Sequence, residues 1–112
     1  MKDNKLKIVM NEFSADCRSL LGDKLAEVRL YGSYARGDYD EESDIDVMLF
    51  FNTDKTEAKK YTSEVCRIAS EIDIKYDVFI SPTLQSKSFF EANKSISGFY
   101  KNVEREGVSF YG

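Results

Sequence analysis

Two aspartates, Asp44 and Asp46, stand two positions apart at the start of an apolar run that ends at Phe51. Side chains at positions i and i+2 of a β-strand project from the same face, so both carboxylates would lie side by side if this run is extended. Carboxylate pairs can share divalent cations, and Mg²⁺ is commonly held by one or two carboxylates together with substrate phosphates. The pair therefore predicts a metal site for a phosphate-containing ligand.

A glycine–serine pair, Gly32 and Ser33, lies upstream, between an apolar strand-like run and a short segment that could open a helix. Glycine permits a positive φ and close approach of a ligand, serine offers a hydroxyl, and the first N–H groups of a helix attract anions. We expect this turn to bind phosphate oxygens. Arg36 follows three residues later, and it either contacts a phosphate or pairs with the acidic residues after it.

Order and spacing connect these two features, because ten residues, 34–43, separate Gly32-Ser33 from Asp44-Ile45-Asp46. This arrangement resembles the nucleotidyltransferases of the DNA polymerase β superfamily, whose pattern is Gly-Ser, a spacer of about ten residues and Asp-x-Asp. The resemblance is strongest to the minimal nucleotidyltransferases, small single-domain proteins often found as antitoxins beside a helical HEPN ribonuclease toxin. It extends to Arg36-Gly37, to Ser43-Asp44-Ile45-Asp46-Val47 and to the C-terminal segment 100–108.

The resemblance implies a reaction and its participants. ATP would be the substrate, two Mg²⁺ ions would bridge Asp44 and Asp46, and Gly32 and Ser33 would hold the β- and γ-phosphates. AMP would pass to a tyrosine of a cognate HEPN toxin and silence its ribonuclease activity. The chain contains no histidine, which excludes histidine-based nucleophilic triads and leaves metal-assisted phosphoryl transfer as the chemistry that these residues favour.

A third carboxylate is expected on a neighbouring strand. Residues 74–80 alternate between apolar and polar types, which predicts a strand with Asp77 on its polar face. Asp73 has the same parity but lies about 13 Å away along an extended strand, so only one of the two can be level with the metals. In the family a third acid beside the Asp-x-Asp pair helps to activate the attacking hydroxyl, and the match of residues 75–79 to that strand favours Asp77 as a catalytic and metal-binding residue.

Alternating helical and extended patterns predict an α/β fold, and the resemblance implies a small mixed sheet flanked by helices, as in the polymerase β-like nucleotidyltransferases. Helical spacing predicts one helix that ends before Gly22 and another over 58–72. Ser81-Pro82 predicts the start of a further helical region that ends at Gly107. The expected strands cover 25–31, 44–51, 74–80 and, at the edge, 108–111.

Composition limits the partners. A chain of 112 residues with 42% hydrophobic content predicts one domain, 1–112, without a separate helical domain around the acceptor. Its net charge of −4 argues against stable nucleic-acid binding, because that depends on basic side chains that displace counterions. No segment suits a signal peptide or a membrane span, so we expect a cytoplasmic protein. Cys17 and Cys66 fall at apolar helical positions and are expected to be buried free thiols.

Two alternative functions stay open at this point. One is a small-molecule nucleotidyltransferase of the aminoglycoside-modifying type, and the other is a non-catalytic antitoxin that neutralises its partner by contact alone. Clustered acids argue against the latter, because burying them without a metal is costly. Tyr34 and Tyr39 fall near the predicted site, where they could contact a base or a partner.

Overall fold

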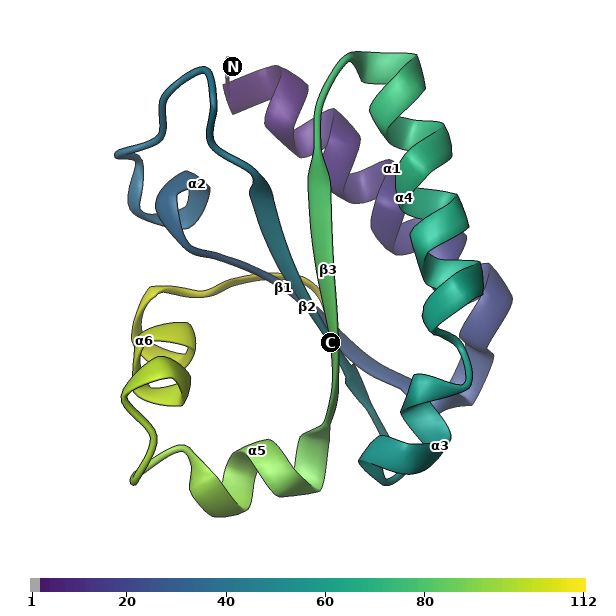
Figure 1. The fold of residues 1–112 in the computed structure, drawn as a ribbon, viewed down its shortest axis with the longest axis vertical. Helices are drawn as coiled ribbons and strands as arrows, with labels where there is room; N and C mark the ends of the chain where they lie inside the picture. The colour runs from purple at the N-terminus through teal and green to yellow at the C-terminus, as the bar shows by residue number, and fades with distance from the viewer. Residues whose placement is uncertain (1–2) are drawn as a thin grey trace.

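A four-stranded sheet in the order β3-β2-β1-β4 forms the centre of the computed structural model, which describes residues 3–112. The inner strand β1 pairs antiparallel with both β2 and β4, whereas β2 and β3 run parallel. The predicted mixed sheet flanked by helices is confirmed (Figure 1). The strands are β1 (Leu25–Tyr31), β2 (Ile45–Phe51), β3 (Ile80–Ser86) and β4 (Val108–Tyr111).

Two long helices, α1 (Asp3–Leu21) and α4 (Thr62–Tyr76), cover one face of the sheet (Figure 1). The larger hydrophobic core lies beneath them, because the odd-numbered residues of β2 point to this face. A 3₁₀ turn, η1 (Gly22–Lys24), joins α1 to β1, and a short helix, α3 (Lys55–Lys59), precedes α4. The residues that β2 contributes to this core are Ile45, Val47, Leu49 and Phe51.

The opposite face carries α5 (Lys87–Asn93) and α6 (Gly98–Glu106) over a smaller core. Met48 and Phe50 of β2 are buried there against Phe90 and Val103. Since the even-numbered residues of β2 point to this side, Asp46 projects on the same face at the beginning of the strand. The sheet thus presents one of the two predicted aspartates beside α6.

A network of charged and polar groups attaches these helices to the sheet. Arg29 of β1 pairs with Glu27 at 2.6 Å and reaches Glu104 of α6 at 3.2 Å, while Lys87 at the start of α5 pairs with Glu27 at 2.8 Å. Burial opposes ionisation of Glu27, but hydrogen bonds from Arg29 and Lys87 outweigh it and lower the pKa of this carboxyl group. The network fixes α6 next to the end of β1 where the glycine–serine turn begins.

The third strand differs from its prediction. Residues 74–76 continue helix α4, and β3 begins only at Ile80. The alternation over 74–80 therefore does not mark a strand, and Ile74 is 85% exposed on the helix surface. Ser81-Pro82 does not begin a helix either, because both residues belong to β3. A proline is accepted there because β3 is an edge strand of the sheet.

The two cysteines have different environments. Cys17 is buried in the main core, as predicted, and desolvation raises the pKa of its thiol to about 12. Cys66 lies on the exposed side of α4, so its predicted burial is wrong. Within residues 3–112, no helix has the length and apolar character needed to cross a lipid bilayer.

Candidate active site

The glycine–serine turn connects β1 directly to a short helix, α2 (Ser33–Arg36). Gly32 has φ +76° and ψ −155°, a conformation that L side chains rarely adopt. Its carbonyl accepts hydrogen bonds from Ala35 and Arg36 at 3.1 Å each, so the N–H groups of Ser33 and Tyr34 come before the first bonded turn. The chain thus forms the predicted turn, with backbone donors available for an anion.

Asp46 lies against this turn. A Cβ atom placed on Gly32 would overlap a carboxylate oxygen of Asp46, so only glycine permits the two groups to approach this closely. Register fixes the contact, because Asp46 pairs with Tyr31, the residue that precedes Gly32. Gly32 and Asp46, fourteen positions apart in sequence, therefore lie together in the candidate site.

The protonation of Asp46 responds to its surroundings. Burial is the main cause that raises the pKa of Asp46, and the nearby Asp44 raises it further, while Arg36 acts in the opposite direction. Asp44 itself is exposed just ahead of β2. Two carboxylates that repel each other in this way provide the hard oxygen ligands that a divalent cation requires.

Arg36 pairs with two acids in the structure. Its guanidinium group contacts Asp38 and Glu106, each at 3.1 Å. The first contact corresponds to one of its two predicted roles, pairing with the acidic loop. The second connects α2 to the last turn of α6 and was not predicted. Contact with a phosphate stays a prediction for this residue.

A pocket of about 290 Å³ opens between the turn and α6. Its polar side brings together four of the predicted residues, namely Gly32, Ser33, Arg36 and Asp46. The opposite side was missed by sequence reasoning, and the only signal for it was the resemblance of the C-terminal segment to the family. The α6 residues on that side are Phe99, Asn102, Val103 and Glu106.

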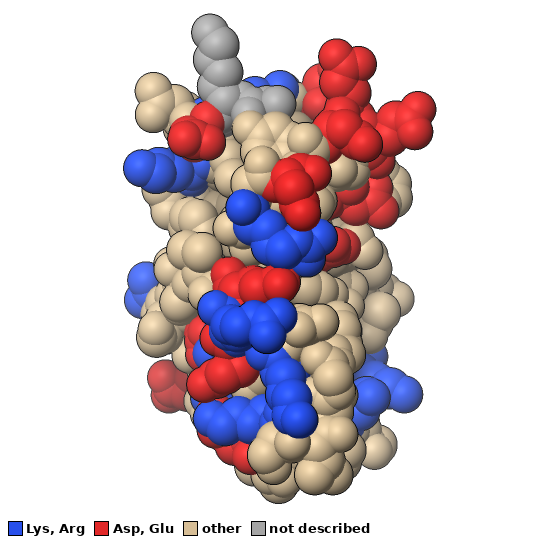
Figure 2. Space-filling model, turned by 90° about the vertical axis from the view of Figure 1, so that its left-hand side faces the viewer, with Lys and Arg blue, Asp and Glu red and all other residues tan. Residues whose placement is uncertain are grey.

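Asp44 lines a neighbouring pocket of about 390 Å³. Asp77 and residues 41–43 of the acidic loop between α2 and β2 line the same pocket. The loop is organised by Asp40, whose carboxylate accepts hydrogen bonds from the Glu42 N–H and the Ser43 hydroxyl at 2.9 and 3.2 Å. Figure 2 views this side of the molecule and has acidic side chains gathered near its top, where the loop between α2 and β2 lies. The rim of this pocket is strongly anionic.

Tyr34 and Tyr39 lie beside this pocket as a stacked pair, with ring centroids 4.3 Å apart and planes 14° apart. Tyr34 also lines the pocket, although most of its ring is buried in the main core. Burial, followed by the neighbouring Tyr39 and acidic groups, raises the pKa of the Tyr34 hydroxyl. The pair therefore contributes packing at the site, and a contact with a base or partner stays a prediction.

Asp77 does not occupy the predicted position on a strand beside Asp46. It ends helix α4 in a left-handed conformation, with φ 54° and ψ 57°. The residue that pairs with Asp46 across the parallel strands is Ser81. In the described part of the chain, no three acidic or cysteine side chains converge in a way that could hold a metal ion. The predicted strand position of Asp77 is therefore wrong.

Asp73, the alternative third acid, has a structural partner. Its carboxylate accepts a hydrogen bond from the backbone N–H of Ile80 at 2.8 Å, which connects the end of α4 to the start of β3. Burial chiefly raises the pKa of Asp73, and Asp44 also raises it, while the Ile80 hydrogen bond lowers it. Asp44 is thus near enough to raise the pKa of Asp73, whose carboxylate stays bound to the backbone.

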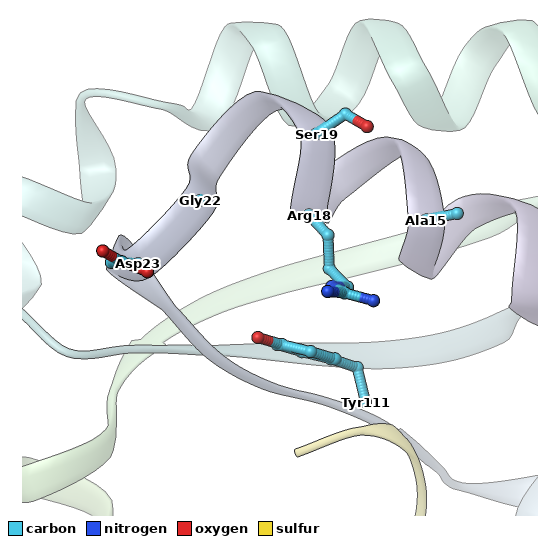
Figure 3. Close-up of a pocket in the computed structure, with 6 residues that line it drawn as sticks. All are labelled: Ala15, Arg18, Ser19, Gly22, Asp23 and Tyr111. Atoms are coloured by element: carbon cyan, nitrogen blue, oxygen red, sulfur yellow. The ribbon is translucent and has the colours of Figure 1, made fainter.

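A separate pocket of about 410 Å³ lies at the other end of β1, around η1. Figure 3 shows Arg18 of α1 above the ring of Tyr111, with 4.5 Å from the guanidinium carbon to the ring centroid. This pocket contains neither the glycine–serine turn nor the paired aspartates. The predicted site lies at the opposite end, where the glycine–serine turn packs on Asp46, one of two neighbouring carboxylates, an arrangement typical of the phosphoryl-transfer class of proteins.

Comparison with known proteins narrows this class. The family model described as "Nucleotidyltransferase domain" matches residues 10–107. Two proteins of Methanocaldococcus jannaschii, named "Putative protein adenylyltransferase MJ0141" and "Putative protein adenylyltransferase MJ0604", are 41% and 35% identical over 100 and 103 residues. These matches cover 89% and 91% of this chain and 93% and 94% of the relatives. The chain belongs to the nucleotidyltransferase domain family, and it is a nucleotidyltransferase.

Solved structures show the same fold. A Sulfolobus solfataricus protein described as a "putative nucleotidyltransferase" superimposes with a TM-score of 0.63 at 21% identity, over 93% of this chain and 78% of that one. A mutant of the toxin–antitoxin MntA–HpeT gives a TM-score of 0.55 at 14% identity, over 91% and 73%. A toxin–antitoxin structure with AMP-PNP gives 0.52 at 18% identity, over 97% and 73%. The predicted resemblance and fold class are confirmed.

Proposed function

We propose that this chain transfers AMP from ATP to a hydroxyl group of a partner protein, a tyrosine of a HEPN ribonuclease toxin, and thereby acts as the antitoxin of a pair. The observation that carries the proposal is the packing of the Gly32 turn on Asp46 within one pocket. This contact would bring a phosphate-binding turn beside a metal-binding carboxylate. Residues 1–112 would act as a single nucleotidyltransferase domain, with the site on one end of the sheet.

A protein acceptor is favoured by the relatives, because the two Methanocaldococcus jannaschii proteins carry the name protein adenylyltransferase. A toxin partner is favoured by the toxin–antitoxin assemblies among the structural neighbours. A nucleic-acid acceptor is disfavoured by the net charge of −4 and by the acidic loop at the rim of the site. The tyrosine and the HEPN class of the toxin rest on the resemblance to the minimal nucleotidyltransferases.

Asp44 and Asp46 would hold Mg²⁺, two ions by analogy with the family. The donor set fits, because both groups are carboxylates and their repulsion would be relieved by a cation. When bound, Mg²⁺ would neutralise charge on the triphosphate and polarise the reacting groups. The residue opposite Asp46 on β3 is Ser81 and not an acid, so Asp44 and Asp46 would be the carboxylates that hold this metal.

The residues of the pocket would orient the reaction. Gly32 and Ser33 would bind the β- and γ-phosphates through N–H and hydroxyl donors, and Arg36 would contact a phosphate after leaving one of its acidic partners. The acceptor oxygen would then attack the α-phosphorus as the bond to pyrophosphate breaks, and its proton would pass to solvent or to a nearby carboxylate. AMP stays on the acceptor and pyrophosphate leaves.

Label transfer tests this proposal. ATP labelled on the α-phosphate would be incubated with Mg²⁺, the purified chain and a host lysate or a co-purified neighbour, with Asp44→Ala as the control. A labelled protein band that requires wild-type enzyme is the expected result, and mass spectrometry would then identify the modified residue. Label on a small molecule alone would indicate the aminoglycoside type. Equal capture of an unlabelled partner by both versions, with no transfer, would indicate a non-catalytic antitoxin.

A further inference from the structure

An exposed aromatic side chain stands at the edge of the candidate active site. Phe99, in the first turn of α6, is 49% exposed, although burying a side chain of this size is favourable. Its ring meets Tyr31 edge to face, with centroids 5.6 Å apart and planes 78° apart. Tyr31 immediately precedes Gly32, so this contact holds Phe99 at a fixed position relative to the phosphate-binding turn.

The pocket that Phe99 lines has two chemically different sides. Gly32, Ser33 and Asp46 form a polar side, whereas on the α6 side Phe99 and Val103 provide apolar surface next to the polar Asn102 and Glu106. A nucleoside triphosphate has the same division, with a charged triphosphate at one end and a flat base at the other. The volume of about 290 Å³ lies near the lower limit for small-molecule sites, so the pocket would enclose only part of a nucleotide.

We propose that Phe99 is the stacking surface for the nucleobase of the bound nucleotide, which makes α6 the base-binding side of the pocket. The proposal rests on the proposed function, because it assumes that Gly32 and Ser33 bind the phosphates. Stacking of a base on an aromatic ring is worth about tenfold or more in affinity and favours no particular base. The ring therefore supplies affinity for a nucleoside over bare polyphosphate.

Phe89 provides a matched control on the neighbouring helix α5. It is also 49% exposed, and both rings contact Tyr100, Phe89 at 6.4 Å and Phe99 at 5.9 Å between centroids. Phe89 does not line the pocket that contains the phosphate turn. Truncating either ring removes a similar exposed aromatic group, and only one of the two truncations alters the proposed base site.

The test compares two ligands, ATP and inorganic tripolyphosphate, by calorimetric titration with Mg²⁺ into the whole chain. Wild type should bind ATP at least about tenfold more tightly than tripolyphosphate. Phe99→Leu, which keeps an apolar contact with Tyr31, should weaken ATP by about tenfold and leave tripolyphosphate unchanged, and Phe99→Trp should restore ATP binding. Phe89→Leu should change neither affinity.

Other outcomes separate the base site from the proposed function. Equal wild-type affinity for both ligands, or ATP binding that is unaffected in Phe99→Leu, would overturn the base site while the phosphate site stands. Equal weakening of both ligands in Phe99→Leu would also overturn it, because the ring would then be supporting the pocket as a whole. No binding of either ligand by the wild-type chain would overturn the proposed function together with the base site.

Discussion

Ser81 stands opposite Asp46 across the parallel pairing of β2 and β3, on the sheet face that α5 and α6 cover. Their side chains share a face because paired residues of neighbouring strands project in the same direction. This position is where a third acid would be level with the first two. An acid introduced at Ser81 should therefore add a ligand to the proposed metal site.

Ser81→Asp should increase Mg²⁺ affinity by roughly tenfold, since the added charge lies beside a partly buried carboxylate. The same charge should lower the melting temperature in the absence of Mg²⁺ and restore it when the ion is added. Titration calorimetry and thermal unfolding with and without Mg²⁺ would measure both effects. Ser81→Asn is the neutral control, and an equal response of the two variants would mean that Ser81 does not face the metal site.

Gly32→Ala should abolish nucleotide transfer and destabilise the protein, because its Cβ would overlap Asp46 and a positive φ costs an L residue about 1–2 kcal/mol. Gly37→Ala is the matched control. Gly37 also has a positive φ, of 88°, but a Cβ there would meet no atom within 4 Å. Denaturant unfolding should show that the positive φ lowers the free energy of unfolding in both variants. The transfer assay should show a loss of activity in Gly32→Ala only.

Asp46→Asn should remove transfer activity and yet raise the stability of the metal-free protein at neutral pH. Burial and Asp44 raise the folded-state pKa of Asp46 above its unfolded value, so the folded state binds this proton more readily. As the pH rises from the pKa of Asp46 in the unfolded state to its pKa in the folded state, the free energy of unfolding of the wild type therefore decreases. Asparagine does not ionise, so the variant keeps its stability over this range. The advantage of the variant should shrink as the pH is lowered below the ordinary aspartate range, as followed by thermal unfolding without Mg²⁺.

Asp77→Gly should retain nucleotide transfer, in contrast to Asp44→Ala and Asp46→Asn. Asp77 has a left-handed backbone at the end of α4, where glycine carries no steric cost, so stability should be unchanged or rise by less than about 1 kcal/mol. Initial rates of transfer and the melting temperature would check both statements. If a folded Asp77→Gly variant lost as much activity as Asp44→Ala, Asp77 would be a catalytic residue.

The sequence was informative where short-range geometry decides the structure. The glycine–serine turn and β2 form as predicted because positive φ, helix entry and strand parity depend only on adjacent residues. The prediction failed over 74–80, where Ile74, Tyr76 and Val78 alternate with polar residues. Ile72 is buried on the packed face of α4 and the helix continues past it, so packing against the sheet outweighed the local alternation.

The base side of the pocket could not be predicted for a different reason. Phe99 and Gly32 are far apart in sequence, and they line one pocket because Arg29 and Glu104 fix α6 across β1. Helical spacing indicated that this segment would be a helix, but the side of the sheet that it covers depends on the path of the whole chain. The pairing of Arg36 with Glu106 could not be predicted for the same reason, because it too depends on where α6 lies on the sheet.

The outer edge of β3 has a consequence for how the molecule behaves at high concentration. The N–H of Ile80 is bound by Asp73, Pro82 has no N–H, and the N–H of Ser86 is bound by the side chain of Gln85. The backbone N–H groups of even-numbered residues in β3 point away from β2, and all three of these residues are even-numbered. Among the even-numbered residues of β3, this leaves the N–H of Leu84 to bond another strand. Another strand could not form a continuous ladder there, which protects the chain from edge-to-edge aggregation.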